Sequence, residues 1–254
     1  MSKLWLPGPR LRHAAEKLGM DRRAFLAGGA GGLAALALAA CNSEGPKSAQ
    51  SVLSAATRWN ERVERALFRH RAMNDAPAGA RLAGAKFPSY FVSDEVPVWN
   101  PAEHGVWRLE IGGLVKNPVQ LTLAELTALP RAELRLEHFC VEGWSAVSVR
   151  TGVRLSELAR RAELLPDARY VDFQSFDDDY HESWDLESAL HPQTLVVYGQ
   201  DGAPLSPAFG APARVYSPVK LGYKNTKYLT RILFLPERNG GYWSDQGYEW
   251  YAGT

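Results

Sequence analysis

Short strand-like segments constrain the fold of this chain more than any other feature. Residues 106–111 alternate apolar and polar side chains as a half-buried strand does. Further apolar segments predict strands at 134–140, 170–175, 195–198, 213–216 and 227–235. Helical signals are fewer and short: Thr122 and Glu125 predict a capping box, Asp185 a helix cap, and 155–162 a short helix. Because strands outnumber helices without alternating regularly with them, we expect an α+β fold of short mixed strands rather than a doubly wound sheet.

The N-terminal segment has the pattern of an export signal. Residues 1–23 are basic, and residues 24–40 run for 17 residues without a charge, short of the roughly 20 needed to span a bilayer. Adjacent Arg22 and Arg23 before Phe25 and Leu26 are typical of the twin-arginine route, which exports folded proteins. We therefore expect residues 1–40 to direct the protein to the periplasmic side of a bacterial membrane. The alternative is a chance Arg-Arg pair before an ordinary secretory signal.

Cys41 follows Leu38-Ala39-Ala40, which resembles the cleavage site of a lipoprotein. On this interpretation Cys41 becomes the acylated N-terminus and anchors the protein to a membrane. The competing interpretation is ordinary cleavage nearby, which leaves Cys41 removed or as a plain thiol.

The mature chain divides into a tether and one domain. Residues 41–86 contain a polar tether and an amphipathic helix from Ser51, whose apolar face we expect to pack on the core, with membrane-surface contact as the alternative. Residues 87–254 form the expected catalytic domain. The whole chain has 29 basic and 28 acidic residues, and residues 1–40 hold six and two of them, so the mature chain has a net charge of −3. This balance indicates no nucleic-acid partner.

Cys140 is the second of only two cysteines, so it has no partner for an internal disulfide if Cys41 is acylated. A buried inert thiol is one interpretation, and a ligand for a soft metal is the other. One cysteine cannot hold an iron–sulfur cluster, which usually takes four, so a metal at Cys140 needs its other ligands from a cofactor. The sequence shows no nucleophile elbow, phosphate loop or paired-histidine zinc motif.

Several ordered motifs resemble one family. They are Phe139-Cys140-Val141-Glu142-Gly143-Trp144-Ser145, Gly210-Ala211-Pro212-Ala213-Arg214, Lys220-Leu221-Gly222-Tyr223-Lys224-Asn225-Thr226-Lys227, and Gly241-Tyr242-Trp243 with Gly247-Tyr248. Together they resemble the sulfite-oxidase-type molybdopterin-binding domain over about residues 87–250. The branch they resemble is the periplasmic protein-methionine-sulfoxide reductases.

The resemblance implies a molybdenum–molybdopterin cofactor, one pterin per chain, with Cys140 as the metal ligand and catalytic residue. The implied cofactor contacts are Ser89, Val92, Ser93, Ser175, Arg214, Asn225, Thr226 and Lys227. Arg214 lies in an apolar strand and needs a partner, which an anionic cofactor would provide. The three lysines of the third motif could instead be solvated loop residues. The aromatic residues after Gly241 are candidates for the wall of a substrate funnel or for the core.

Departures from the family pattern narrow the expected activity. Ser93 stands where sulfite oxidases carry an arginine, and Val141-Glu142-Gly143 replaces their Gly-Asn-Arg. Phe209 stands where the reductase branch has an asparagine that contacts the cofactor, so that contact is in doubt. We expect reduction of a small S-oxide or an oxidised protein, such as methionine sulfoxide. The alternatives are a sulfite dehydrogenase and, in another class, a non-catalytic lipoprotein binding module on the same fold.

The chain stops at Thr254, soon after the aromatic motif, which leaves no room for a dimer-forming or haem domain. We therefore expect a monomer without haem or an iron–sulfur cluster. It would exchange electrons with an external electron-transfer protein, a cytochrome or a membrane haem protein.

Overall fold

The computed structural model describes residues 50–67, 73–74, 76–77, 79–177 and 180–254. Contacts divide the chain into two compact units, 1–57 and 58–254, and the fold below belongs to the second. The export signal, with Arg22 and Arg23, and the acylation site Cys41 lie outside the described residues. The predicted boundaries at residues 40 and 86 therefore stay predictions.

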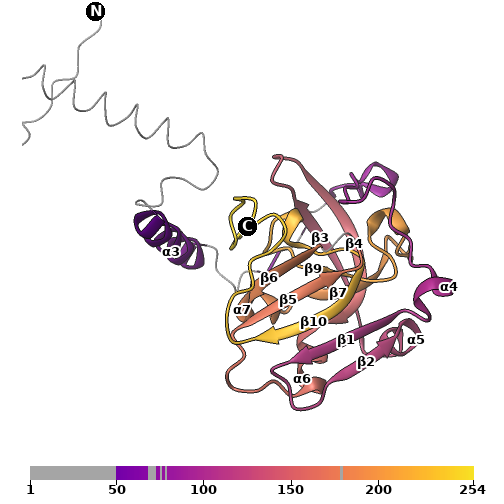
Figure 1. Ribbon diagram of the computed structural model, residues 1–254. Helices are drawn as coiled ribbons and strands as arrows, with labels where there is room; N and C mark the ends of the chain where they lie inside the picture. Colours follow the sequence, from indigo (N-terminus) through magenta and orange to yellow (C-terminus); the bar gives the residue numbers. More distant parts are fainter. Residues whose placement is uncertain (1–49, 68–72, 75, 78, 178–179) are drawn as a thin grey trace, which may run out of the picture. The chain divides into compact units, whose positions relative to one another are not determined.

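The first sheet holds five strands in the order β2-β1-β10-β5-β6 (Figure 1). In chain order these are β1 (Arg108–Gly113), β2 (Val119–Thr122), β5 (Tyr170–Ser175), β6 (His181–Asp185) and β10 (Leu229–Leu235). The β1–β10 pair is parallel and the others are antiparallel, so the sheet is mixed.

The second sheet follows the order β3-β4-β7-β8, and β9 pairs with the other edge of β7. Its strands are β3 (Arg131–Phe139), β4 (Ser145–Arg154), β7 (Leu195–Gln200), β8 (Ala203–Pro204) and β9 (Arg214–Tyr216). β3 and β4 form a long antiparallel hairpin from Arg131 paired with Val153 to Phe139 paired with Ser145. The turn of this hairpin carries Cys140.

Helices are short outside the N-terminal segment. They are α4 (Pro101–His104), α5 (Leu123–Thr127), α6 (Leu155–Ala162) and α7 (Leu186–Ala189), with 3₁₀ turns at Gly84–Lys86, Pro207–Phe209 and Gly222–Lys224. The predicted capping box is confirmed, because the Thr122 side chain accepts from the Glu125 amide while Glu125 accepts from the Thr122 amide. Asp185 caps α7 by accepting from the Ser188 amide at 2.8 Å. Mixed sheets with few short helices confirm the α+β prediction.

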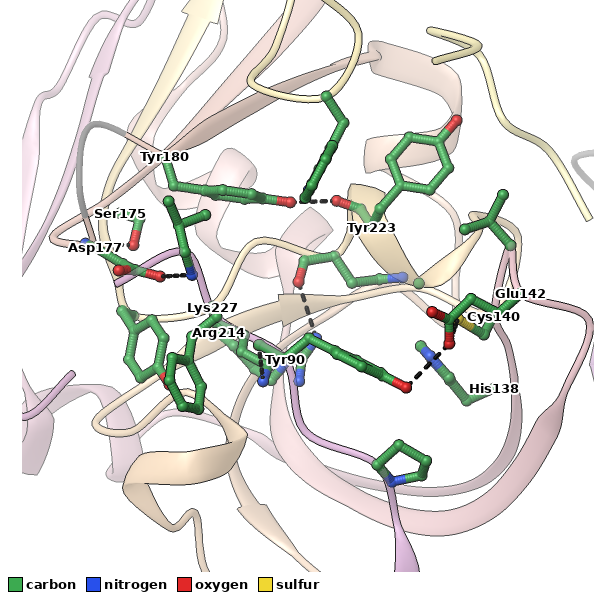
Figure 2. Close-up of a pocket in the computed structure, with 18 of the residues that line it drawn as sticks. Tyr90, His138, Cys140, Glu142, Ser175, Asp177, Tyr180, Arg214, Tyr223 and Lys227 are labelled. Carbon is green, nitrogen blue, oxygen red and sulfur yellow. Dashed lines mark hydrogen bonds between the residues drawn. The ribbon is translucent and has the colours of Figure 1, made fainter. Parts of the chain in front are cut away.

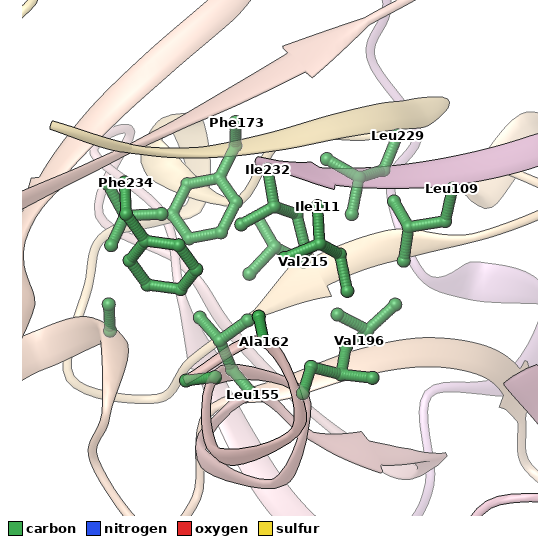
Figure 3. Packing of buried hydrophobic residues seen from close by; sticks show 14 of the residues in the cluster. Leu109, Ile111, Leu155, Ala162, Phe173, Val196, Val215, Leu229, Ile232 and Phe234 are labelled. Atoms are coloured by element: carbon green, nitrogen blue, oxygen red, sulfur yellow. The ribbon is translucent and has the colours of Figure 1, made fainter. Parts of the chain in front are cut away.

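The main core fills the space between the two sheets and α6 (Figure 3). Leu109, Ile111, Ile232 and Phe234 reach it from the first sheet, and Val196 and Val215 from the second, all fully buried. Leu155, Leu158, Ala159 and Ala162 recur at helical spacing and give α6 its buried face. This core holds the sheets together and leaves the β3–β4 turn free to line a cavity.

The N-terminal helix α3 (Gln50–Leu67) does not bury its apolar face. Trp59 is 66% exposed and Leu67 69% exposed, so the expectation that this face packs on the core is wrong. The opposite side of the helix makes the contacts: Glu61 pairs with Arg238 at 3.4 Å, and the Arg65 guanidinium lies 5.3 Å over the Tyr251 ring. Among the described helices, none combines the length and apolar character that crossing a bilayer requires.

Candidate cofactor site

A cavity of about 290 Å³ lies where the β3–β4 turn meets the segment before α4 and the loops that flank β9 and β10. Figure 2 shows Cys140, Glu142 and His138 on one side of this cavity and Ser175, Asp177 and Tyr180 on the other. The side chains that line it are Phe87, Pro88, Tyr90, Phe91, Val92, His138, Cys140, Val141, Glu142, Trp144, Ser175, Asp177, Tyr180, Arg214, Tyr223, Asn225, Lys227, Tyr228, Trp243 and Tyr248.

Cys140 begins the turn that joins β3 to β4. The Cys140 amide donates to the Trp144 carbonyl at 3.0 Å, and the Gly143 amide donates to the Cys140 carbonyl at 3.0 Å. Gly143 has φ +84°, a conformation that glycine adopts without strain. The two backbone hydrogen bonds and Gly143 close the turn, so that the thiol lies at the tip of the hairpin, half-buried and facing the cavity.

Burial raises the pKa of the Cys140 thiol, and the negative charge of Glu142 raises it further. Backbone N–H groups of Glu142 and Val141 act in the opposite direction because they favour the thiolate. The Glu142 carboxylate lies 4.0 Å from the sulfur. A thiol in these surroundings is not an activated nucleophile, which requires a lowered pKa.

Positive charge gathers deeper in the site. Arg214 on β9 is buried and donates to the carbonyls of Asn225 at 2.8 Å and Phe209 at 3.1 Å. Lys227 donates to the carbonyl of Ala208 at 2.9 Å and to that of Tyr90. All of these acceptors are neutral, so within the described residues no carboxylate neutralises either cation by direct contact.

A third cation, Arg150 on β4, lies behind the cavity wall. Its side chain is fully buried between the rings of Phe87 and Tyr216, at 4.9 and 4.7 Å, and it donates to Gln200. Its Nε and Nη2 atoms have no hydrogen-bond partner among the described residues. Sequence analysis did not single out Arg150, and the signal available was a charged residue next to Val149 in a segment rich in small and apolar residues.

Burial and neighbouring positive charge lower the pKa values of the basic groups in this site. Burial and the charge of Arg150 lower the pKa of Arg214 to about 9, and burial with both arginines lowers that of Lys227 to about 6. Burial and the same three charges lower the pKa of His138 to about 3. At neutral pH the site therefore keeps Arg214 charged and Lys227 mostly neutral, and an anionic ligand would favour the charged form of Lys227.

The structure gathers most of the implied cofactor residues. Cys140, Val92, Ser175, Arg214, Asn225 and Lys227 line the cavity. Ser89 does not line it, but its hydroxyl contacts the Lys227 ammonium at 3.4 Å. Thr226 is fully buried beside these residues, and its Oγ1 has no partner among the described residues.

Three implied contacts, Val92, Ser93 and Asn225, have polar groups that already bond within the protein. The amides of Val92 and Ser93 donate to the Asp177 carboxylate at 3.0 and 3.1 Å, and Ser93 does not line the cavity. The Asn225 side chain accepts from the Ser217 amide at 2.6 Å and donates to the carbonyls of Lys220 and Leu221 at 3.2 and 3.1 Å. These side-chain and backbone groups shape the cavity wall in this structure.

Lys220 and Lys224 are buried, contrary to the interpretation of this motif as solvated loop residues. Each pairs with a carboxylate: Lys220 with Asp185 at 3.0 Å, and Lys224 with Glu182. Both therefore stabilise the fold, while Lys227 of the same motif faces the cavity. Of the aromatic residues after Gly241, Trp243 and Tyr248 line the cavity, whereas Trp250 is buried in the fold.

Sequence analysis missed several cavity residues. Glu142 and Trp144 stood inside a quoted motif without an assigned role, and Tyr90, Tyr180 and Tyr228 carried no motif of their own. Tyr228 is fully buried with a hydroxyl that has no partner in the described part of the chain. The cavity fits an anionic cofactor that carries a soft metal. The thiol suits the metal, and the basic side chains and unpaired hydroxyls suit anionic oxygens.

Comparison with known proteins identifies the relatives of this chain. The family model described as "Oxidoreductase molybdopterin binding domain" matches residues 95–243. A protein of Azospira oryzae, provisionally named protein-methionine-sulfoxide reductase subunit YedZ1, is 38% identical over 92% of this chain and 88% of its own length. These matches confirm the family resemblance that the motifs indicate.

Two further relatives carry the name protein-methionine-sulfoxide reductase catalytic subunit MsrP. That of Ralstonia nicotianae is 32% identical over 68% of this chain and 64% of its own length. That of Xanthomonas axonopodis pv. citri is 34% identical over 55% of this chain and 48% of its own length. The chain thus spans less than two thirds of both MsrP proteins. The sulfane dehydrogenase SoxCD of Paracoccus pantotrophus aligns with a TM-score of 0.49 and 22% identity, covering 52% of this chain and 39% of that one.

Proposed function

The chain belongs to the family of oxidoreductases with a molybdopterin-binding domain, and from this premise we propose that it reduces S-oxides, with methionine sulfoxide as the model substrate. The observation that carries the proposal is the cavity in which the Cys140 thiol faces the cation site of Arg214 and Lys227. The names of the relatives YedZ1 and MsrP support the direction of the reaction.

We assign the residues by the chemistry of their groups. Cys140 offers the soft sulfur ligand for the metal. Arg214 and Lys227 face the cavity and would hold the phosphate end of the pterin, since guanidinium and ammonium groups suit phosphate and a bound anion would favour the protonated form of Lys227. The unpaired Thr226 hydroxyl and the cavity-facing Ser175 would add neutral hydrogen bonds. Arg150 would contribute charge from behind the Phe87 ring.

When bound, the molybdenum–pterin group supplies an oxygen acceptor that cycles by two electrons. Overall, the sulfur–oxygen bond of the substrate breaks, two electrons and two protons enter, and a thioether and water leave. The electrons would come from an external electron-transfer protein, a cytochrome or a membrane haem protein. The chain itself would position the substrate: Trp144, Trp243 and Tyr248 give the cavity aromatic walls.

Assays of S-oxide reduction and of sulfite oxidation test this proposal. The holoenzyme, produced in a host that makes the cofactor, should oxidise a reduced viologen dye when methionine sulfoxide is added. It should not reduce ferricyanide when sulfite is added. Sulfite-driven reduction of ferricyanide without S-oxide turnover would replace the proposal with a sulfite dehydrogenase. Retention of the pterin without turnover on either substrate would favour a binding module.

We also propose export by the twin-arginine route and a lipid anchor at Cys41, from the sequence pattern alone. The double substitution Arg22→Lys and Arg23→Lys should leave the precursor in the cytoplasm. The substitution Cys41→Ser should release the exported protein from membranes. Normal export of the first variant would refute the twin-arginine route, and unchanged membrane attachment of the second would refute acylation as the anchor.

A further inference from the structure

Glu142 places a carboxylate beside the thiol at the open end of the cavity. One of its oxygens, Oε2, accepts from the Tyr90 hydroxyl and from the Trp144 indole N–H, both at 3.0 Å, and lies 4.0 Å from the Cys140 sulfur. Figure 2 shows Tyr90 reaching across the cavity to this carboxylate. The two hydrogen bonds hold the carboxylate beside Cys140, the proposed metal ligand.

Charge in the cavity is divided between its two ends. The cations Arg214 and Lys227 lie at the deep end, where the proposed cofactor phosphate binds. The other acidic side chain of the lining, Asp177, accepts from the amides of Val92 and Ser93 and lies across the cavity from Cys140 (Figure 2). Glu142 is therefore the acidic group at the thiol end among the described lining residues.

The thiol end is also the open end. Glu142 is exposed, Val141 is 49% exposed and Tyr248 43% exposed, and all three line the cavity. A substrate entering past these residues meets one negative charge among largely apolar and aromatic walls. Such walls suit an uncharged organic group, and the carboxylate disfavours an anion.

We propose that Glu142 determines the charge preference of this site, so that it accepts uncharged or cationic S-oxides and disfavours anionic ones. This inference rests on the proposed S-oxide reduction and specifies the class of substrate. The inference favours a methionine sulfoxide residue within a peptide, whose α-carboxyl group is an uncharged amide, over small anions such as sulfite.

The expected size follows from Coulomb's law. Two unit charges about 6 Å apart at an effective dielectric constant of about 40 interact by an amount that corresponds to roughly a tenfold change in an equilibrium or rate constant. The effect should weaken in salt, because the carboxylate is exposed and salt screens exposed charges.

A matched pair of substrates measures this preference. N-acetylmethionine sulfoxide carries one negative charge at neutral pH, and its amide carries none. For each holoenzyme we would measure the ratio of kcat/KM for the amide to that for the acid. The wild type should prefer the amide, and Glu142→Gln should reduce the ratio by roughly tenfold, since glutamine keeps an acceptor oxygen and removes the charge. An unchanged ratio in Glu142→Gln would overturn the inference.

Two control variants separate charge from other effects. Glu237→Gln removes a charge from an exposed side chain that does not line the cavity, and its ratio should equal that of the wild type. Tyr90→Phe removes one hydrogen bond to Glu142 but keeps the carboxylate, which the Trp144 indole N–H still holds at 3.0 Å, so its ratio should stay close to that of the wild type. If Tyr90→Phe changes the ratio as much as Glu142→Gln does, shape rather than charge sets the preference and the inference fails.

A second measurement does not depend on the reaction. In the full chain produced without cofactor, Cys140 can be alkylated by neutral iodoacetamide or anionic iodoacetate, and peptide mapping gives the rate at this cysteine. Both reagents react with the same thiolate, so the ratio of the two rates does not depend on the pKa of the thiol. The ratio therefore reports the charge near the sulfur. Glu142→Gln should raise the iodoacetate rate relative to the iodoacetamide rate several-fold.

If the wild type reduces no S-oxide, the proposed function fails while the alkylation ratio still decides the charge inference. If S-oxides are reduced but Glu142→Gln leaves both the kcat/KM ratio and the alkylation ratio unchanged, the proposed function stands and the charge inference is wrong.

Discussion

The Lys220 ammonium lies 3.0 Å from the Asp185 carboxylate, and the two side chains are only 1% and 3% exposed. The same ammonium donates to the Tyr251 carbonyl at 2.6 Å and lies 3.7 Å from the centre of the Tyr251 ring. Asp185 also caps α7 through the Ser188 amide and hydroxyl, both at 2.8 Å. This pair therefore joins the C-terminal segment, the end of β6 and α7. A similar pair joins Glu182 on the same strand to Lys224 in the 3₁₀ turn Gly222–Lys224.

We expect Lys220→Met to destabilise the protein by about 3–5 kcal/mol, because it leaves the Asp185 carboxylate buried without its counter-charge. Urea unfolding followed by circular dichroism measures the change. Lys116→Met is the matched control: its pair with Glu163, at 3.2 Å, joins side chains that are 61% and 52% exposed, and such pairs contribute at most about 1 kcal/mol. Equal losses of unfolding free energy in the two variants would show that the buried pair contributes no more to stability than the exposed pair.

Gly152 should not tolerate a side chain. A Cβ at this position would lie 2.2 Å from the Val196 carbonyl oxygen, at the irregularity where β4 pairs with β7. We expect Gly152→Ala to cost about 1–3 kcal/mol through overpacking, measured as a lower Tm. Gly112→Ala is the control, since its Cβ would meet Leu233 at an ordinary 3.6 Å. A Gly152→Ala variant as stable as Gly112→Ala would contradict the close strand contact.

Lys227 should make the unfolding free energy of the cofactor-free protein increase with pH between about 6 and 10.5. Its pKa is lowered from 10.5 to about 6 in the folded chain, so the unfolded chain binds more protons across this window. The stabilisation is therefore present above 10.5 and is lost as the pH falls through 6. Lys227→Met should flatten the profile of unfolding free energy against pH, whereas Lys86→Met, at an exposed position, should not. Identical slopes for both variants and the wild type would contradict the lowered pKa of Lys227.

Cys140→Ala should lose molybdenum while keeping the fold, because a small residue replaces another at the end of a strand. Elemental analysis of protein from a cofactor-producing host should give near one molybdenum per chain for the wild type and close to none for the variant. Circular dichroism should superimpose for the two proteins. Cys140→Ser tests the ligand further, since a hydroxyl suits soft metals poorly and should not restore the metal. Full metal content in either variant would remove Cys140 as the ligand.

Local signals predicted the elements that depend on neighbouring residues. The capping box at Thr122 and Glu125, the Asp185 cap and the strand 170–175 all appear where the sequence indicated them. Their hydrogen bonds and side-chain periods lie within a few residues, so the sequence alone carries the information. The strands β2, β4, β6 and β8 were missed. In β4 and β6 the buried positions include polar residues such as Ser148, Arg150 and Glu182, which mask the apolar pattern, and β2 and β8 are short strands without a buried residue.

The sequence by itself determined the family, the lone thiol at the end of a strand and the turn that presents it. It could not decide which cations face the cofactor cavity. Lys220, Lys224 and Lys227 stand in one motif, yet the first two pair with carboxylates 35 and 42 residues away, and the third faces the cavity. The order of strands in the sheets brings β6 beside the first two, places Arg150 behind the cavity wall, and so leaves the buried positive charge for a ligand. Partners so distant along the chain meet only through tertiary structure.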